Sequence, residues 1–363
     1  MSTPPDLPGL LALTVERQAS DLHIHCGTPP LARIYGEIVP ITEQVLDAEA
    51  CYYVVFSGLT EAQRARLQQD LELDFVLDFP ELGRFRCNAH YSRGGVEAVY
   101  RHIRGAVLDL ETLGHRPIVK ELCQRTEGLI LVTGHSGAGK TTTMAAMVQW
   151  INTIRSSVII TIEDPIEYSF SPGMGVIKQR EVGTDTKSFA AALRHTARQD
   201  PNVIVIGEMR DPETMQAALI AAETGHLVIG TLHTIDAAKT VDRIVNVFPG
   251  DQQNQVTTQL ANSLLAVISQ RLLPRADGQG RVLAVETMIA NAAIRACIRD
   301  HKPHMIIGQI EIGGHEGMNT LDESLARLTE EGLITYPVAL ANARDPDRIP
   351  KPVETKKKKG LFG

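Results

Sequence analysis

A glycine-rich segment near the middle of the chain has the residue types and spacing of a phosphate-binding loop. Residues 134–141 read Gly-His-Ser-Gly-Ala-Gly-Lys-Thr and fit the pattern Gly-x-x-x-x-Gly-Lys-Ser/Thr. Glycines let backbone N–H groups converge on phosphate oxygens, and the N-terminus of a following helix adds partial positive charge. Lys140 can reach the β- and γ-phosphates, and the Thr141 hydroxyl can bind Mg²⁺. We therefore predict that this segment binds a nucleoside triphosphate.

The sequence around this loop supplies the elements that such a loop requires. A strand-like apolar run at 129–132 precedes it, and a helix-favouring stretch through residue 150 follows it. An ordinary glycine-rich surface loop would need neither element, so the context favours phosphate binding. The predicted contacts with the nucleotide are Gly134, Ser136, Gly137, Ala138, Gly139, Lys140, Thr141 and Thr142.

Three other strand-like apolar runs each end at a residue that can carry charge: Glu163, Glu208 and His233. Ligands of an open parallel sheet bind beyond the carboxyl ends of its strands, so we expect these ends to converge on the phosphate loop. One carboxylate would deprotonate the attacking water, and the other would organise Mg²⁺ through its waters. The spacing does not decide which glutamate has which role. A strand-end carboxylate can also merely cap a helix, but four polar strand ends together favour a shared site.

The remaining elements indicate an α/β protein with two domains. Residues 1–104 mix helical and strand patterns and predict a small α+β domain, followed by a linker at 105–117. From 118 to 345, strand and helix patterns alternate as in a parallel sheet with crossover helices, and several short helices end this domain. Within it, apolar residues between 260 and 272 predict a helix. The proline- and lysine-rich residues 346–363 predict a disordered basic tail.

Composition restricts the functional classes. The formal net charge is −7 even though four lysines gather in the tail, which argues against a large basic groove for nucleic acid. The five cysteines show no C-x-x-C pair, so neither a zinc module nor a disulfide framework is expected, and a reducing cytoplasm fits best. We find no apolar run of the roughly 20 residues that a membrane-spanning helix requires.

The motifs together resemble the secretion ATPases of the type II/type IV pilus superfamily, and specifically its type IV pilus retraction branch. The resemblance covers nearly the whole chain up to about residue 340. It lies in the phosphate loop and in residues 20–24 (Ser-Asp-Leu-His-Ile), 162–168 (Ile-Glu-Asp-Pro-Ile-Glu-Tyr), 179–183 (Gln-Arg-Glu-Val-Gly), 205–211 (Val-Ile-Gly-Glu-Met-Arg-Asp), 222–234, 293–295 (Ala-Ile-Arg) and 317–322 (Gly-Met-Asn-Thr-Leu-Asp).

This resemblance implies a PAS-like N-terminal domain joined to a RecA-like P-loop ATPase domain, assembled as a hexameric ring. It makes Glu163 the water-activating base and Glu208 the Walker B acid that holds Mg²⁺ through water. His226 and His233 belong to the His box, with His226 contacting the nucleotide. Two arginines of the N-terminal domain would complete the catalytic set, namely Arg101 and Arg86, with Arg84 as the alternative to the latter.

The function implied is a cytoplasmic motor at the inner-membrane base of a pilus. It would hydrolyse ATP with Mg²⁺ to disassemble pilin and drive twitching motility, with an inner-membrane platform protein and a second retraction ATPase as partners. No nucleic-acid partner is expected. An accessory retraction ATPase is the nearest alternative. A nucleic-acid translocase on the same core and a regulatory nucleotide-binding module without turnover are alternatives from other classes.

Overall fold

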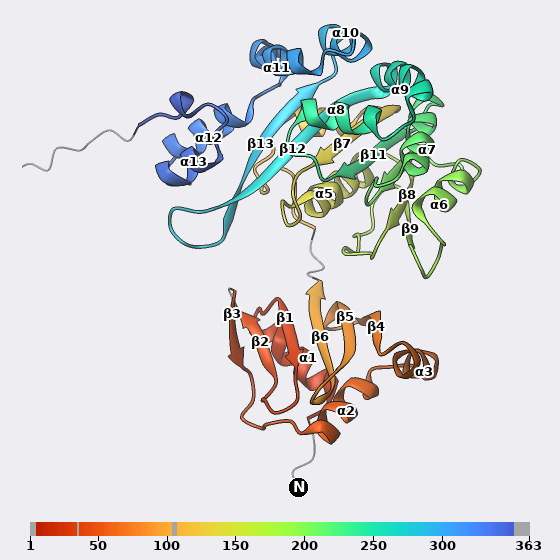
Figure 1. The fold of residues 1–363 in the computed structure, drawn as a ribbon, viewed down its shortest axis with the longest axis vertical. Helices are drawn as coiled ribbons and strands as arrows, with labels where there is room; N and C mark the ends of the chain where they lie inside the picture. Colours follow the sequence, from red (N-terminus) through yellow and green to blue (C-terminus); the bar gives the residue numbers. More distant parts are fainter. Residues whose placement is uncertain (1–4, 35, 104–106, 352–363) are drawn as a thin grey trace, which may run out of the picture. The chain divides into compact units, whose positions relative to one another are not determined.

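The computed structural model describes residues 5–34, 36–103 and 107–351 (Figure 1). The chain divides into two compact units. One comprises Met1–Ala106 and Glu167–Ser169, and the other comprises Val107–Ile166 and Phe170–Gly363. No helix among the described residues is both long enough and apolar enough to cross a membrane.

The first unit packs helices against a six-stranded antiparallel sheet with the strand order β3-β2-β1-β6-β5-β4. Its core includes the fully buried Leu22, Phe85 and Tyr100, one from each of three neighbouring strands of this sheet. The elements are α1 (Leu7–Glu16), β1 (Asp21–Ile24), β2 (Leu31–Ile34), β3 (Glu37–Pro40), α2 (Ala48–Ser57), α3 (Glu61–Asp70), β4 (Glu72–Phe79), β5 (Gly83–Ser92) and β6 (Gly95–Ile103).

The second unit contains a seven-stranded sheet with the order β13-β12-β7-β11-β10-β8-β9, in which only β13 runs antiparallel to its neighbour. Its strands are β7 (Gly128–Thr133), β8 (Val158–Glu163), β9 (Val176–Glu181), β10 (Val203–Ile206), β11 (Leu227–Leu232), β12 (Leu264–Pro274) and β13 (Arg281–Ile289). Its helices are α4 (Ile118–Cys123), α5 (Lys140–Ile154), α6 (Phe189–Thr196), α7 (Pro212–Glu223), α8 (Ala237–Asn246), α9 (Gly250–Ser263), α10 (Ala292–Arg299), α11 (Ile306–Ile312), α12 (Leu321–Glu330) and α13 (Tyr336–Asn342).

Helices cover both faces of this sheet, which explains why its central strands are apolar throughout. Alternate residues of β7 enter different cores. Leu129 and Leu131 pack with residues of α7 and α9, whereas Ile130 and Val132 pack with residues of α5. The strand pattern ahead of the phosphate loop therefore reflects burial on two sides.

The predicted helix between 260 and 272 is wrong beyond Ser263. There α9 ends, and β12 begins at Leu264, pairing with β7 on one side and β13 on the other. Periodicity alone cannot distinguish a strand buried on both faces from a buried helix, so the pairing partners of this run decide the element.

Two predicted boundaries also shift. Leu110 and His115 of the predicted linker are buried in the second unit, while residues 105 and 106 lie outside the described residues. The predicted tail starts too early, because residues 346–348 form a 3₁₀ turn and Ile349 is buried against α12 and its neighbours. Residues 352–363 of that tail lie outside the described residues.

Candidate nucleotide-binding site

The phosphate loop connects β7 to α5 through glycines with positive φ angles. Gly134, Gly137 and Gly139 have φ values of +146°, +76° and +87°. A β-carbon on Gly134 would lie 2.5 Å from the carbonyl oxygen of Gln270, so both the backbone conformation and the available space require glycine. Gly139 is also the N-cap of α5 and provides no side-chain cap. Backbone donors of the first helical turn therefore remain suited to an anion.

The other predicted loop contacts occupy this same turn. Ser136 is exposed at the loop, and Ala138 is buried. Thr141 and Thr142 are half-buried in the first turn of α5. A hydroxyl in this position, together with a strand-end carboxylate, offers the oxygen ligands that Mg²⁺ prefers.

Lys140, His233 and Glu208 form a connected group at the ends of three strands. The Lys140 ammonium donates to the carbonyl oxygen of Gly134 at 2.8 Å and lies 3.4 Å from Nδ1 of His233. Nε2 of His233 lies 2.9 Å from Oε1 of Glu208. With Nε2–H donating to the carboxylate, Nδ1 can accept from the ammonium, so the imidazole joins the phosphate-loop lysine to the acid.

The charge of Glu208 is stabilised by its neighbours. Partial burial raises the pKa of the Glu208 carboxyl, but a hydrogen bond from Arg210 at 2.5 Å and the charges of His233, Arg210 and Lys140 outweigh it. The net pKa lies below the usual value for glutamate. Glu208 is therefore ionised at neutral pH and suited to organising a cation.

Glu163 ends the neighbouring strand β8 and is more deeply buried, with 5% of its surface exposed. Its Oε1 accepts hydrogen bonds from the Thr161 hydroxyl at 2.6 Å and the Gln179 amide at 3.1 Å. The register pairs Ile206 of β10 with Ile162 of β8, so the residues that follow these two lie at the same sheet edge. Two carboxylates in different surroundings thus lie at the carboxyl ends of adjacent strands, Glu163 as the last residue of β8 and Glu208 two residues after β10.

The strand order explains why these groups converge. β7, β11, β10 and β8 are consecutive neighbours and parallel, so the phosphate loop, His233, Glu208 and Glu163 share one edge of the sheet (Figure 1). His226 does not join them within one chain, because it precedes β11 and so lies at the opposite end of that strand. There its Nδ1 lies 3.0 Å from the carbonyl oxygen of Ala221.

The candidate arginines lie on the sheet of the first unit. Arg86 of β5 is paired in register with Arg101 of β6, which in turn is opposite Asp21 of β1. Nε of Arg101 donates to Asp21 at 2.8 Å, although its side chain is 66% exposed. Arg84 lies two residues before Arg86 on the same strand, hence on the same face, and is half-buried.

Sequence reasoning missed three buried polar residues that support the loop. His115 contacts the Thr143 hydroxyl at 2.8 Å, and the Gln270 amide donates to that hydroxyl at 2.7 Å. Burial lowers the pKa of His115 to about 4, so its ring is neutral at pH 7. No motif marks these residues, because they come from three separate segments of the chain.

A metal ion at this site would need ligands besides the protein side chains that the structure describes. Among the described residues, no set of three or more His, Cys, Asp or Glu side chains is arranged to hold a metal ion. Thr141 and Glu208 fit instead a Mg²⁺ that keeps several waters and shares the phosphates of its nucleotide.

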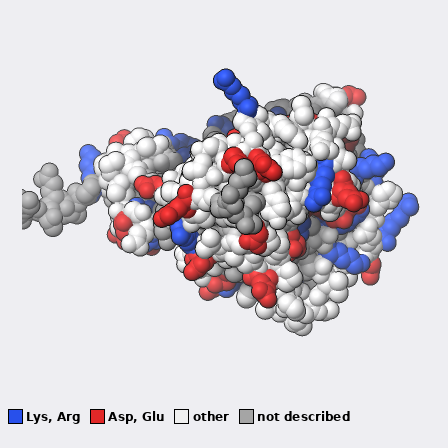
Figure 2. Space-filling view, turned by 90° about the horizontal axis from the view of Figure 1, so that it is seen from below, with Lys and Arg blue, Asp and Glu red and all other residues white. Residues whose placement is uncertain are grey.

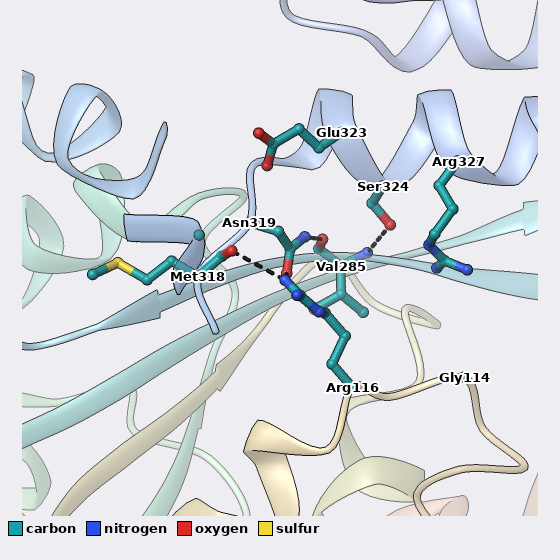
Figure 3. Close-up of a pocket in the computed structure, with 9 residues that line it drawn as sticks. Gly114, Arg116, Val285, Met318, Asn319, Glu323, Ser324 and Arg327 are labelled. Carbon is teal, nitrogen blue, oxygen red and sulfur yellow. Dashed lines mark hydrogen bonds between the residues drawn. The ribbon is translucent and has the colours of Figure 1, made fainter. Parts of the chain in front are cut away.

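A cleft of about 340 Å³ elsewhere in the second unit does not contain the predicted residues (Figure 3). Its lining includes Arg116, Asn319 and Ser324. Arg116 donates to the carbonyl oxygen of Met318 at 3.0 Å, and the Ser324 hydroxyl accepts from the Val285 amide at 3.1 Å. Its polar groups thus serve the protein itself, and the strand-end group is the better candidate site.

Comparison with known proteins agrees with this geometry. Residues 10–312 match the family model of the Type II/IV secretion system protein. The chain is 43% identical to the type IV pilus retractation ATPase PilT of Pseudomonas aeruginosa, covering 95% of this chain and 99% of that protein. It is 39% identical to the type IV pilus ATPase PilU of the same organism, covering 92% and 87%. A crystal structure of the pilus retraction motor PilT with bound ADP aligns with a TM-score of 0.89 at 44% identity, covering 94% and 98%.

Proposed function

This chain is an ATPase of the Type II/IV secretion system protein family with a RecA-like core, and we propose that it is the motor that drives type IV pilus retraction. The observation that carries the ATPase part of this proposal is that His233 contacts both Lys140 and Glu208 at the edge of the sheet. The match to a retraction ATPase over nearly both full lengths supports the assignment of the motor's direction.

In the reaction proposed, the loop amides and Lys140 bind the triphosphate of ATP. Mg²⁺ held near Thr141 and Glu208 would neutralise charge on the phosphate oxygens when bound. Glu163 accepts the proton of the attacking water, since it is a buried carboxylate that does not need to hold the cation. His233 contacts both Glu208 and Lys140, and through these contacts it responds to the γ-phosphate.

We propose that the working assembly is a hexameric ring. Arg86 and Arg101 then complete a nucleotide site by stabilising the charge of the transferring phosphoryl group. Movement between the PAS-like and RecA-like domains would convert hydrolysis into mechanical work on pilin at the cytoplasmic side of the inner membrane. An inner-membrane platform protein and a second retraction ATPase are the proposed partners.

Two alternatives receive less support. The chain is 39% identical to PilU and 43% identical to PilT. The higher identity to PilT supports the primary retraction role over the accessory role. A nucleic-acid translocase would need a continuous basic surface. Acidic and basic side chains are interspersed on the face drawn in Figure 2, and the formal net charge is −7.

The proposal predicts the phenotype of a host strain that lacks this protein. Such cells should be densely piliated and unable to retract their pili, as scored by electron microscopy and by the movement of surface-attached cells. Expression of the wild-type chain should restore retraction.

A matched pair of lysine variants sharpens this test. Lys140→Ala should fail to restore retraction, because the ammonium that contacts the triphosphate is missing. Lys302→Ala, which removes a surface partner of Asp300 at 3.6 Å, should restore it fully. Cells without pili in the deletion strain would point to pilus extension instead.

A further inference from the structure

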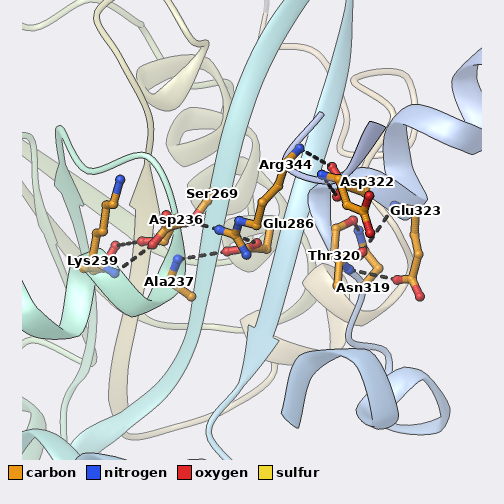
Figure 4. Close-up of polar contacts among 12 residues, drawn as sticks. Asp236, Ala237, Lys239, Ser269, Glu286, Asn319, Thr320, Asp322, Glu323 and Arg344 are labelled. Carbon is orange, nitrogen blue, oxygen red and sulfur yellow. Dashed lines mark hydrogen bonds and ion pairs between the residues drawn. The ribbon is translucent and has the colours of Figure 1, made fainter. Parts of the chain in front are cut away.

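The helix that follows His233 begins against two buried carboxylates (Figure 4). Asp236 is the N-cap of α8, and its Oδ1 accepts a hydrogen bond from the Lys239 amide at 2.7 Å. Glu286 of β13 has only 2% of its surface exposed, and its Oε1 accepts from the Ala237 amide at 2.9 Å. Both carboxylates therefore hold the start of the same helix.

Two buried carboxylates repel each other unless a cation compensates them. Arg344 supplies that cation: its guanidinium lies 3.2 Å from Oδ2 of Asp236 and 3.9 Å from Oε2 of Glu286. Among the residues that the structure describes, no other Lys, Arg or His lies within ion-pair distance of either carboxylate. Burial raises the pKa of the Glu286 carboxyl above its usual value. The hydrogen bond from the Ala237 amide and the charges of Arg344 and, more weakly, Arg271 oppose that rise without cancelling it.

The backbone of Arg344 is itself held in place. Asp322 of α12 is buried, and its two carboxylate oxygens accept from the backbone amides of Arg344 at 2.8 Å and Asp345 at 2.9 Å. Because the Arg344 side chain is 46% exposed, its ion pairs add little to the free energy of unfolding. The hydrogen bonds from the backbone to Asp322 nevertheless fix the position from which the guanidinium reaches Asp236 and Glu286.

We propose that Arg344 is a positioning residue for the nucleotide site. It fixes the start of α8 and thereby the short loop that carries His233 out of β11. That loop must keep its place for His233 to contact Lys140 and Glu208. The inference rests on the ATPase function proposed above, and it adds a residue from the last described part of the chain that no motif contains.

Removing the guanidinium should lower turnover more than substrate affinity. Without it, the loop relaxes as Asp236 and Glu286 separate or take up a proton, and a displacement of about 1 Å can lower a catalysed rate on the order of 100-fold. We expect kcat of Arg344→Ala to fall roughly 10- to 100-fold. The phosphate loop itself is unchanged, so KM for ATP should stay within about twofold of wild type.

The experiment measures phosphate release by the full-length chain over a range of ATP concentrations. Arg344→Lys should recover most of kcat, because an ammonium can still neutralise Asp236, whereas Arg344→Gln should not. Arg348→Ala is the matched control: Arg348 lies in the same segment, is 43% exposed and pairs with Glu311 at 2.9 Å. It should leave kcat unchanged.

A double-mutant cycle tests whether the effect passes through His233. In a His233→Ala background, Arg344→Ala should cost less than about threefold in kcat, because the group that it positions is already missing. Equal losses in both backgrounds would overturn the inference. Arg344→Gln takes the place of Arg344→Ala if emission from Trp150 shows that the alanine variant is unfolded.

The same phosphate-release measurements distinguish an error in the proposed function from an error in the inference about Arg344. A wild-type chain that releases no phosphate contradicts the ATPase proposal, and the inference falls with it. Wild-type turnover combined with an unchanged kcat in a folded Arg344→Ala or Arg344→Gln variant overturns the inference alone.

Discussion

At the scale of single residues, one imidazole connects motifs that are far apart in the sequence. His233 is separated by 93 residues from Lys140, yet its two ring nitrogens face Lys140 and Glu208. Glu163 has a separate environment, with Thr161 and Gln179 donating to it. The two glutamates therefore lie in different surroundings: Glu208 contacts Arg210 and His233, and Glu163 accepts from Thr161 and Gln179.

Glu163→Gln tests the role of the more buried glutamate. Glutamine keeps the size of the side chain but cannot take a proton from water, so ATP should still bind while steady-state phosphate release falls on the order of 100-fold or more. Binding is measured with a fluorescent ATP analogue, and turnover by phosphate release.

The control for this prediction is Glu213→Gln in the first turn of α7, where the side chain is exposed. It should retain turnover. Full activity of Glu163→Gln would assign the base to Glu208.

At the scale of elements, the phosphate loop depends on a strand that supplies none of the predicted contacts. The carbonyl of Gln270 in β12 closes the space beside Gly134, and the Gln270 amide reaches the Thr143 hydroxyl in α5. His115, from the segment before α4, completes this support. The loop is thus shaped by its glycines and also by packing against β12.

Gly134→Ala and Gly137→Ala should separate these two contributions. Both positions have positive φ, but a β-carbon would meet Gln270 only at Gly134, whereas nothing lies within 4 Å at Gly137. Gly137→Ala should cost about 1 kcal/mol of unfolding free energy, and Gly134→Ala about 3 kcal/mol with loss of ADP binding. Urea unfolding followed by emission of Trp150, the only tryptophan, measures both. Equal costs would contradict the role assigned to Gln270.

The stability of the second unit should depend on pH through His115. Burial lowers the pKa of His115 to about 4 from 6.5, so the unfolded chain binds more protons between these values. The stabilisation is complete above pH 6.5 and is lost as pH falls toward 4. Between pH 7.5 and 5.0, wild type should lose about 2 kcal/mol more unfolding free energy than His115→Gln. Parallel pH profiles in urea unfolding would contradict this.

At the scale of the whole molecule, the first unit carries a row of charged side chains across its sheet. Arg33, Asp21, Arg101 and Arg86 are successive register partners on β2, β1, β6 and β5. Asp21 pairs with Arg101 at 2.8 Å and lies 3.8 Å from Arg33. Arg86 makes no ion pair with any residue that the structure describes, which suits the proposal that it meets a phosphate in the assembled motor.

Arg86→Ala should therefore lower ATP turnover by a factor on the order of 10³ while ATP still binds. Arg66→Ala removes an exposed partner of Asp70 on α3 and should leave turnover unchanged. Phosphate release by the full chain measures both variants. Wild-type turnover in Arg86→Ala together with a loss in Arg84→Ala would transfer the role to Arg84.

The sequence by itself determined the residue types of the site and the elements that carry them, because glycine spacing, strand-length apolar runs and strand-end charges are local patterns. The strands occur where those patterns predict them: β8 ends at Glu163, β10 ends two residues before Glu208, and β11 ends one residue before His233. The tertiary structure decided which strands are neighbours. That order depends on packing between distant segments, and it joins His233 to Lys140 and Glu208, leaves His226 at the opposite end of β11, makes residues 264–274 a strand, and brings Arg344 to the helix that follows His233.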